Sequence, residues 1–485
     1  MDSMQTQTSH KGAHTPLYVS VADRLARMID QQTFLPGDRV PSIRNLSRQL
    51  KVSINTVKEA YALLEDRRLL EARPQSGYYV CNRLPDIPAD PEIAPSDISP
   101  TGVSIGEMVE MIMRNSGEPG LVQFGCAIPN PDLLPIAKIG RMLANEARLR
   151  PVDHVSYTMP PGCKRLRTEI AKRLLDCGCT VKARDIVTTT GCSEAVFLAL
   201  QAICRPGDTV AVESPVYFNF LQLIQTLGLR ALEIPATQRE GMSLEALRYA
   251  LDHNRVKAVL CITNFSNPLG ACMPEERKRE LVNLLESRDI PLIEDDIHGD
   301  LGFDNERPLA AKAYDQTGNV ILCSSFSKTV APGYRVGWIV PGRFQPEIER
   351  LKMVVNLAAA APTQLALAEF LANGGYDHHL RHIRRVYAQK VAEMSEAIGR
   401  HFPAGTRVTR PQGGFCLWVE MPDEVDALRL YARALKHKIT LAPGPVFSAT
   451  GKFRNCIRLN AAFWTDRLEG TLKTLGGLAK EMVGS

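Results

Sequence analysis

Apolar residues recur at helical spacing near the start of the chain, at Val21, Leu25, Met28 and Ile29. These positions correspond to i, i+4, i+7 and i+8, so they mark one face of a helix. Two shorter helices are expected to follow, one after Pro41 and Ser42 and the other after Ser53, because serine is a common helix cap. The segment therefore predicts three helices in succession.

The second and third of these helices are joined by a tight turn at residues 51–52. The second helix carries Ile43, Leu46 and Leu50 on one face, and the third is expected to bury Val57, Ala60, Tyr61 and Leu64. Residues 73–77, followed by YYVC, are typical of a β-hairpin. Residues 1–81 thus predict a helix-turn-helix with a hairpin wing.

Farther along the chain, short runs rich in Val, Ile and Leu alternate with helical patterns. The runs are residues 186–189, 209–212, 258–263, 291–293 and 320–323. This alternation predicts an α/β domain with a parallel sheet that helices cover on both faces. Between the two regions, residues 82–104 form a stretch that contains five prolines, as expected of a semi-rigid linker. The predicted organisation is 1–81, linker 82–104, and 105–485.

Composition places the chain among ordinary globular proteins, because its 485 residues are 45% apolar and 23% charged. A chain of this length forms a large core, so we expect the twelve cysteines to be free thiols in a reducing cytoplasm. Residues 1–16 hold no apolar secretion segment, and the most apolar stretch, 353–368, is too short and interrupted to cross a bilayer. Neither export nor membrane insertion is expected.

The net charge of +5 is modest, but its distribution is uneven. Between residues 39 and 58 no Asp or Glu occurs, while the same stretch contains Arg39, Arg44, Arg48, Lys51 and Lys58. This basic run covers both helices of the predicted helix-turn-helix. It favours an anionic partner, although a solvated surface on a small helical domain used for protein contact is an alternative.

Four segments of this region resemble the winged helix-turn-helix domain of the GntR family along its full length: PLYVSVADRL, PGDRVPSIRNLS, VSINTVKEAYALLE and ARPQSGYYV. The resemblance implies binding to an operator in double-stranded DNA. Ile54 stands where the family usually carries an arginine, the commonest specific reader of guanine. The expected DNA-contacting residues are Arg39, Ser42, Arg44, Ser53, Asn55, Thr56, Lys58 and Arg73. Of these, Arg39 and Arg73 are expected on phosphates.

In the larger region, polar segments follow four predicted strands, namely TTGCSEA, NFSNPLG, EDD and SSFSK. Open α/β sheets bind ligands at the carboxyl ends of their strands, so we expect the four segments to converge on one crevice. Each has a plainer explanation when taken alone: a helix cap at Ser193, a turn at Asn267, a solvated acidic loop at 294–296 and an exposed Lys328. Their occurrence together favours a binding site.

The residue types suit a phosphorylated aromatic aldehyde. A phosphate would lie at the start of a helix, against Gly191, Cys192, Ser193 and Arg335. The Asp295 carboxylate would keep a pyridine nitrogen protonated, and Lys328 would form a Schiff base with the aldehyde. Asn267 would donate to a ring oxygen, while Tyr217 would stack on the ring.

The segments NPLG, EDD and SSFSKTVAPGYRVGW resemble fold-type I pyridoxal phosphate (PLP) enzymes of the aminotransferase class, from about Leu121 to the carboxyl terminus. The resemblance implies a large part at about 150–350, a small part built from the flanking segments, and further cofactor contacts from Ser325 and Ser327. Tyr157 matches a tyrosine that reaches the phosphate of the neighbouring subunit. Arg458 matches the arginine that binds the substrate carboxylate.

One position differs from the usual aminotransferase pattern. His298 stands where most members have a tyrosine that donates to the ring oxygen. A histidine can donate the same hydrogen bond. Because its side chain titrates near neutrality, we expect His298 to alter the pKa of the Schiff base.

A GntR-like reader joined by a proline-rich tether to an aminotransferase-like domain resembles the MocR subfamily of bacterial transcriptional regulators. That resemblance implies pyridoxal 5′-phosphate as cofactor, a small amino-compound effector that displaces Lys328, a head-to-tail homodimer and a cytoplasmic, nucleoid-associated protein. Two alternatives stay open. One is a working aminotransferase with an accessory DNA-binding domain, and the other is a DNA-binding protein whose PLP fold serves only for dimerisation.

No metal site is expected. The His378 and His382 pair has the i, i+4 spacing of metal ligands, with His379 beside it. However, no cysteine or other third ligand completes a site, and the segment HHLRHIRR is typical of an exposed helix face.

Overall fold

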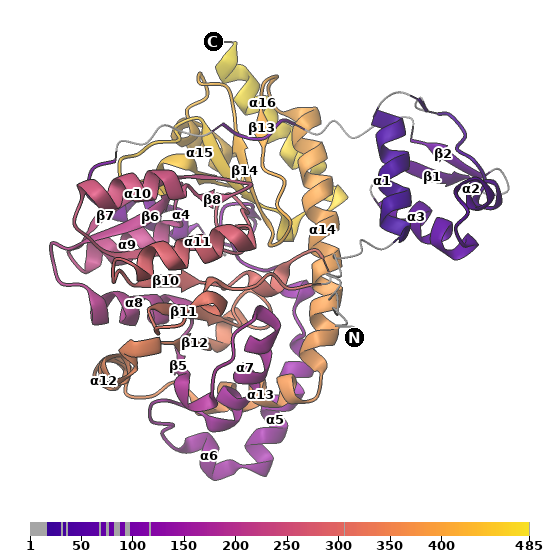
Figure 1. Cartoon of the computed structure of the whole chain (residues 1–485). Coiled ribbons are helices and arrows are strands. Elements are labelled where there is room, and N and C mark those ends of the chain that lie inside the picture. Colours follow the sequence, from indigo (N-terminus) through magenta and orange to yellow (C-terminus); the bar gives the residue numbers. More distant parts are fainter. Residues whose placement is uncertain are drawn as a thin grey trace, which may run out of the picture. The chain divides into compact units, whose positions relative to one another are not determined.

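The computed structural model describes residues 17–30, 33–34, 37–66, 69–73, 77–81, 88–92, 98–115, 118–304 and 306–484. The chain forms two compact units, residues 1–87 and 88–485 (Figure 1). No disulfide joins the twelve cysteines, all of which lie in the described part. Among the described residues, no helix has both the length and the apolar character that a membrane span needs.

The first unit has three helices and a hairpin, as the sequence predicts. The helices are α1 (Leu17–Asp30), α2 (Ile43–Leu50) and α3 (Ile54–Asp66). The hairpin consists of β1 (Leu70–Arg73) and β2 (Gly77–Val80), which pair antiparallel. The unit is therefore a helix-turn-helix with a hairpin wing.

The core of the first unit follows the apolar pattern of the sequence. Val57, Ala60, Tyr61 and Leu64 of α3 are all buried, as are Val21, Leu25 and Ile29 of α1. The Tyr61 hydroxyl donates to the Pro41 carbonyl at 2.5 Å, and its ring centroid lies 4.8 Å from that of Tyr78. Tyr61 thus connects α3 to the start of α2 and to the wing.

A nine-stranded sheet forms the centre of the described second unit, with strand order β3-β7-β6-β9-β10-β11-β12-β5 and β8 beside β7. The strands are β3 (Thr101–Gly102), β5 (Val187–Thr189), β6 (Thr209–Ser214), β7 (Arg230–Thr237), β8 (Gly241–Met242), β9 (Val256–Cys261), β10 (Leu292–Asp295), β11 (Val320–Ser325) and β12 (Gly337–Val340). Strands β7, β6, β9, β10 and β11 run parallel. In contrast to the all-parallel expectation, β12 is antiparallel to both β11 and β5.

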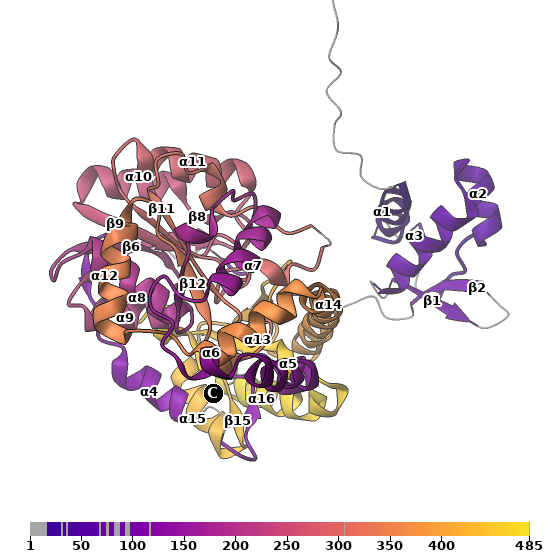
Figure 2. The same cartoon turned by 90° about the horizontal axis from the view of Figure 1, so that it is seen from below.

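Helices cover both faces of this sheet, as predicted. Alternate residues of a strand point to opposite faces, so Val210 and Val212 of β6 join one core while Ala211 joins another. The first core includes α8 (Cys192–Ile203) and α9 (Phe218–Thr226), and the second includes α10 (Leu244–His253) and α11 (Glu275–Glu286). Figure 2 shows these helix pairs on the two sides of the strands.

The remaining elements of the second unit come from both flanks of the sheet region. The helices are α4 (Gly106–Arg114), α5 (Ile136–Leu149), α6 (Pro151–Val155), α7 (Lys164–Leu174), α12 (Gln345–Asn356), α13 (Ala361–Ala372), α14 (Gly375–His401), α15 (Ala427–Lys436) and α16 (Glu469–Val483). A four-stranded sheet joins β13 (Arg407–Val408), β14 (Cys416–Glu420), β17 (Cys456–Asn460) and β16 (Ala442–Pro443), and β4 (Val122–Gln123) pairs with β15 (Ile439–Thr440). The long helix α14 connects the part of the unit that contains the nine-stranded sheet to the part that contains the four-stranded sheet (Figure 1).

Candidate functional site

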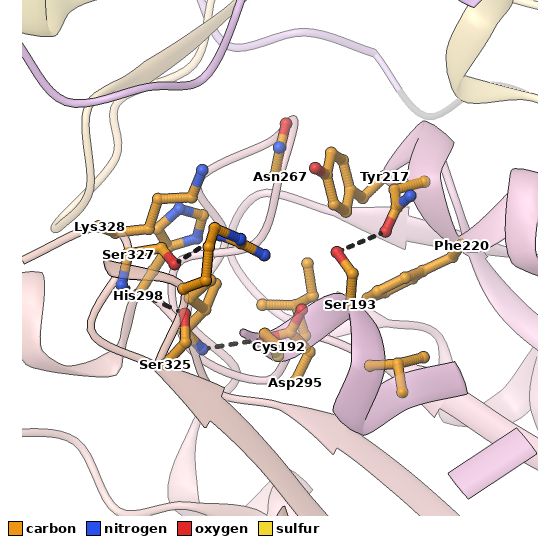
Figure 3. Close-up of a pocket in the computed structure, with 15 residues that line it drawn as sticks. Cys192, Ser193, Tyr217, Phe220, Asn267, Asp295, His298, Ser325, Ser327 and Lys328 are labelled. Carbon is orange, nitrogen blue, oxygen red and sulfur yellow. Dashed lines mark hydrogen bonds between the residues drawn. The ribbon is translucent and has the colours of Figure 1, made fainter. Parts of the chain in front are cut away.

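The four polar segments that follow predicted strands do converge on one pocket. Its lining includes Ser193 at the start of α8, Asn267 after β9, Asp295 at the end of β10 and Lys328 after β11. In Figure 3, Cys192 and Ser193 lie on one side of this pocket, while Lys328 and Asn267 lie across from them. The carboxyl edge of the sheet therefore positions the predicted site residues.

One end of the pocket has the features of a phosphate site. Cys192 and Ser193, the first residues of α8, line it, and an α-helix leaves its first N–H groups without internal partners. Arg335 lies beside them and donates to the Ser327 hydroxyl at 3.3 Å and to the Thr190 carbonyl at 3.1 Å. Among the described residues no carboxylate pairs with this guanidinium, which is therefore available to an anion.

Glycine is required at the start of α8 for two reasons. Gly191 has a φ of 85°, in the left-handed region, and a Cβ built on it would lie 2.4 Å from Arg335 Nη2. Ser327 also donates its backbone N–H to the Ser325 hydroxyl at 3.2 Å. Gly191, Arg335 and the two serines thus form one compact cradle around the helix start.

Asp295 provides a buried carboxylate in the same pocket. Its Oδ1 accepts hydrogen bonds from Ile297 N at 3.0 Å and from Cys192 Sγ at 3.3 Å. Burial raises the pKa of Asp295 to about 6, an effect that the hydrogen bond from Cys192 partly offsets. A cationic ring nitrogen placed against Asp295 would remove this cost of burying the charge.

Replacing Asp295 with asparagine is expected to separate cofactor binding from stability. Folding raises the pKa of Asp295 from 3.8 to about 6. Ionisation of Asp295 therefore destabilises the cofactor-free fold by an amount that grows between pH 4 and pH 6 and stays the same above pH 6. The Asp295→Asn variant should therefore lose cofactor retention, yet unfold a few degrees higher at pH 8 when cofactor-free. The gain is at most about 3 kcal/mol, since one pKa unit is worth 1.36 kcal/mol.

Thermal unfolding of cofactor-free wild type and variant at pH 4 and pH 8 measures this effect. The difference between the two proteins should be much smaller at pH 4, where Asp295 is almost fully protonated in the folded chain and, with its ordinary pKa of 3.8, only partly ionised in the unfolded chain. A variant that keeps the cofactor, or that is less stable than the wild type at pH 8, would contradict the assigned role.

Lys328 lies in the pocket, where its amine has a backbone carbonyl as hydrogen-bond acceptor. Its Nζ donates to the Ala127 carbonyl at 2.6 Å. Burial lowers the pKa of Lys328, and the positive charge of Arg458 lowers it further. A lowered pKa increases the fraction of neutral amine, which is the form that attacks an aldehyde.

Arg458 is fully buried on β17, behind the pocket residue Asn267. Its Nη1 donates to Asn267 Oδ1 at 3.1 Å, and its Nη2 donates to the Gly125 carbonyl. Its Nε is buried without a hydrogen-bond partner, and no described carboxylate pairs with the guanidinium. Because a buried cation without an anionic partner is costly, this arrangement fits an anion supplied by a ligand.

His298 lines the pocket but does not titrate near neutrality, so that expectation is wrong. Burial lowers the pKa of His298 to about 3, and the nearby Lys328 lowers it further. The imidazole is therefore neutral at physiological pH. Its Nδ1 is buried and has no hydrogen-bond partner among the described residues, which leaves one ring nitrogen available to a bound group.

Tyr217 lines the pocket from the start of α9, and burial raises its pKa to about 12, so the hydroxyl stays protonated. Tyr157 is different, because it is 78% exposed and is not among the residues that line the pocket. The sequence analysis missed Asn219, which accepts a hydrogen bond from Ser193 at 3.1 Å. Its position within ESPVYFNF, two residues after Tyr217, was the available signal.

The predicted DNA-contacting residues of the first unit are mostly exposed. Arg39, Arg44, Asn55 and Lys58 are exposed, and Ile54 at the start of α3 is 51% exposed. None of the basic residues in the run 39–58 forms an ion pair with another described residue. Their charges are therefore available to phosphates.

The predicted serine and threonine contacts also have local roles. Ser42 caps α2 by accepting from Asn45 N at 3.3 Å, and Ser53 caps α3 by accepting from Thr56 N at 3.0 Å. The Ser53 and Thr56 hydroxyls are 2.8 Å apart and hydrogen-bonded. Arg73 ends β1, and its side chain lies outside the described part of the chain.

The histidines of α14 do not form a metal site. His379 is buried, and its Nε2 hydrogen-bonds to the Thr329 carbonyl oxygen at 2.7 Å. His378 and His382 belong to no cluster of metal-ligating residues within the described part of the chain. Their spacing reflects one exposed helix face with His379 turned inward.

Comparison with known proteins defines the class of both units. Residues 142–468 match the family described as "Aminotransferase class I and II", and residues 17–80 match "Bacterial regulatory proteins, gntR family". The crystal structure of LysN, an alpha-aminoadipate aminotransferase from Thermus thermophilus complexed with N-(5′-phosphopyridoxyl)-L-leucine, is similar with a TM-score of 0.71 and 28% identity. The similarity covers 78% of this chain and 95% of the LysN chain.

Fold and site together define an aminotransferase-like domain that binds pyridoxal 5′-phosphate, linked to a winged helix-turn-helix. The chain is 38% identical to YdcR over 96% of its length and 99% of YdcR, and 36% identical to YjiR over 95% and 98%. Both are described as uncharacterized HTH-type transcriptional regulators of Escherichia coli. The chain belongs to this family of GntR-type regulators with an aminotransferase-like domain, the MocR subfamily.

Proposed function

We propose that this regulator binds an operator in double-stranded DNA and responds to an amine that carries a carboxylate. The cofactor would be held by Lys328, with its phosphate in the cradle of Gly191 and Arg335 and its ring nitrogen against Asp295. Bound there, pyridoxal 5′-phosphate supplies an electrophilic carbonyl and an electron-withdrawing ring. The effector amine would take the place of Lys328.

The observation that carries this proposal is the state of Arg458. This buried guanidinium has only neutral hydrogen-bond acceptors, Asn267 Oδ1 and the Gly125 carbonyl oxygen. A carboxylate could bind it bidentately and would supply the missing anion. Because Asn267 also lines the cofactor pocket, the carboxylate and the reacting amine would occupy adjoining places.

We further propose a head-to-tail homodimer that acts on the nucleoid in the cytoplasm. Support comes from Tyr157, which is 78% exposed although its family counterpart contacts a phosphate in the neighbouring subunit. Exposed apolar side chains on the adjoining helices α5 and α6, Leu149, Val152 and Val155, favour a covered surface there. Two readers in one dimer would bind two half-sites of an operator.

Fluorescence anisotropy with operator DNA tests the proposal on the full-length, cofactor-loaded protein. A panel of amino acids should include one that changes operator affinity. The Lys58→Ala variant should bind DNA more weakly and lower the slope of log affinity against log salt by about one unit. A matched control is Lys473→Ala, which removes an exposed charge from α16 of the second unit and should have no effect.

Two results would reject the proposal. The first is operator binding that Lys58→Ala leaves unchanged in both affinity and salt slope. The second is an operator affinity that no amino acid alters while the protein turns over an amino acid and a keto acid. That second outcome would favour an aminotransferase with an accessory DNA-binding domain, a function that the intact Lys328 and Asp295 pair also permits.

A further inference from the structure

Residues 88–92, within the proline-rich segment, are held on the surface of the second unit. Backbone atoms of residues 88–92 take part in three hydrogen bonds. Val408 N donates to Ala89 O, Arg410 Nη2 donates to Pro88 O, and Glu92 N donates to Glu420 Oε2, each at 2.8 Å. The linker predicted at 82–104 is therefore attached to the second unit through residues 88–92.

Opposite charges reinforce this attachment. Asp90 lies between two arginines, with Oδ2 at 3.1 Å from Arg239 Nη2 and Oδ1 at 3.7 Å from Arg410 Nε. Glu92 Oε1 lies 2.6 Å from Arg407 Nη2. These arginines come from positions far apart in the sequence. Arg239, Arg407 and Arg410 form a basic surface, called the tether groove below.

We propose that the tether groove is a docking surface for the acidic segment 88–92 of the same chain, and that the effector pocket controls this docking. Docking fixes the number of residues between the reader and the point where the chain is held. When Pro88 is held, the tether between Cys81 and the attached chain has six residues, 82–87. When the segment is released, the tether has sixteen residues, 82–97, and ends at Ile98, which packs on the sheet core.

The difference in tether length has a calculable effect if two readers bind one operator, and in this respect the proposal rests on the proposed function. The effective concentration of a tethered module falls roughly as the −3/2 power of tether length. Lengthening the span from six to sixteen residues should therefore lower it about fourfold. Release of the segment would weaken binding to a two-half-site operator and leave binding to one half-site unchanged.

The tether groove and the effector pocket share a loop. Asn267, which accepts the hydrogen bond from Arg458, begins a short turn that ends at Gly270. The Gly270 backbone packs against Pro411 so closely that a Cβ on Gly270 would lie 2.5 Å from Pro411 Cβ. Pro411 directly follows Arg410. An effector carboxylate that takes Arg458 away from Asn267 acts on this loop and loosens the hold on Asp90.

Hydrogen–deuterium exchange on the full-length, cofactor-loaded protein tests the docking without DNA. The double substitution Asp90→Asn with Glu92→Gln keeps the side-chain shapes and removes both charges from the segment. Exchange of the two amides that hold the segment, Glu92 N on Glu420 Oε2 and Val408 N on the Ala89 carbonyl, should rise about two- to tenfold, because exposed ion pairs are individually weak. Glu424→Gln is the matched control, since Glu424 is exposed and has no ion pair among the described residues.

The amino acid that alters operator binding should also raise exchange of these two amides in the wild type. Unchanged exchange in the double variant overturns the docking, and unchanged exchange with an active amino acid overturns the control by the pocket. Because exchange is measured without DNA, a failure of the proposed function would appear separately, as an absence of operator binding.

In the operator assay, the double variant should lose about fourfold in affinity for two half-sites and keep its affinity for a single half-site. An equal loss on both DNA fragments would indicate damage to the reader, and it would contradict a tether effect.

Discussion

We expect Lys328→Ala to abolish the borohydride-stable cofactor label that the wild-type protein should acquire. The expectation follows from the position of Lys328 in the pocket, where its Nζ is held by the Ala127 carbonyl at 2.6 Å and burial lowers its pKa. A neutral amine attacks the cofactor aldehyde, and reduction makes that bond permanent. Purified wild type should be yellow, while the variant should lose this colour and its response to amino acids.

Peptide mapping of the reduced protein provides the measurement. The pyridoxyl group should be found on the peptide that contains Lys328. Lys278 and Lys352 serve as internal controls, because both are buried but neither lines the pocket; Lys278 donates to Asn264 Oδ1 and Lys352 to Glu194. A label on either control lysine, or a full label in Lys328→Ala, would refute the assignment.

Operator binding by Lys328→Ala distinguishes a sensing role from a structural one. If the second unit served only for dimerisation, the variant would bind DNA as the wild type does and the wild type itself would ignore amino acids. If Lys328 carries the sensing cofactor, only the wild type responds.

The sequence predicted the parallel strands well because their apolar runs are long and bounded by turns. Strands β6, β9, β10 and β11 lie within about two residues of the predicted runs. Strand β12 was missed although it is as long as β10, and strand β7 was missed because Glu233 and Pro235 interrupt its apolar run. Short or polar-interrupted strands are defined by pairing with neighbours, which a local pattern does not contain.

Site positions at strand ends could be predicted from the sequence, whereas their environments could not. The strand that ends at Asp295 was visible as an apolar run, yet the hydrogen bond from Cys192 to Asp295 joins residues far apart in the sequence. Likewise, His298 was expected to titrate near neutrality, but its burial depends on the packing of Phe415 and other distant residues, and its pKa falls to about 3.

The docking of residues 88–92 illustrates the same limit. Five prolines predict an extended chain, but an extended chain can be either solvated or bound to a surface. The choice depends on Arg239, Arg407 and Arg410, none of which is near the linker in sequence. Composition alone therefore does not predict the contacts of such a segment.

If the effector carboxylate binds Arg458 as proposed, this residue determines which amines the protein prefers. The side chain is completely buried, donates to Asn267 and Gly125, and has one further N–H without a partner. An amino acid would exchange these neutral acceptors for a carboxylate, while the corresponding decarboxylated amine would leave the guanidinium without an anion. The wild type should therefore prefer the amino acid strongly.

Arg458→Gln should remove that preference. Truncating one partner of a buried charge pair costs about 2–5 kcal/mol, so affinity for the amino acid should fall roughly 30-fold or more. Affinity for the decarboxylated amine should stay near the wild-type value, which shows that the variant folds and holds the cofactor. Arg458→Lys keeps the charge but loses the bidentate fork, and it should fall between the two. Spectral titration of the bound cofactor measures all three proteins. Equal affinities of the wild type for both ligands, or an unchanged preference in Arg458→Gln, would show that the effector carboxylate binds elsewhere.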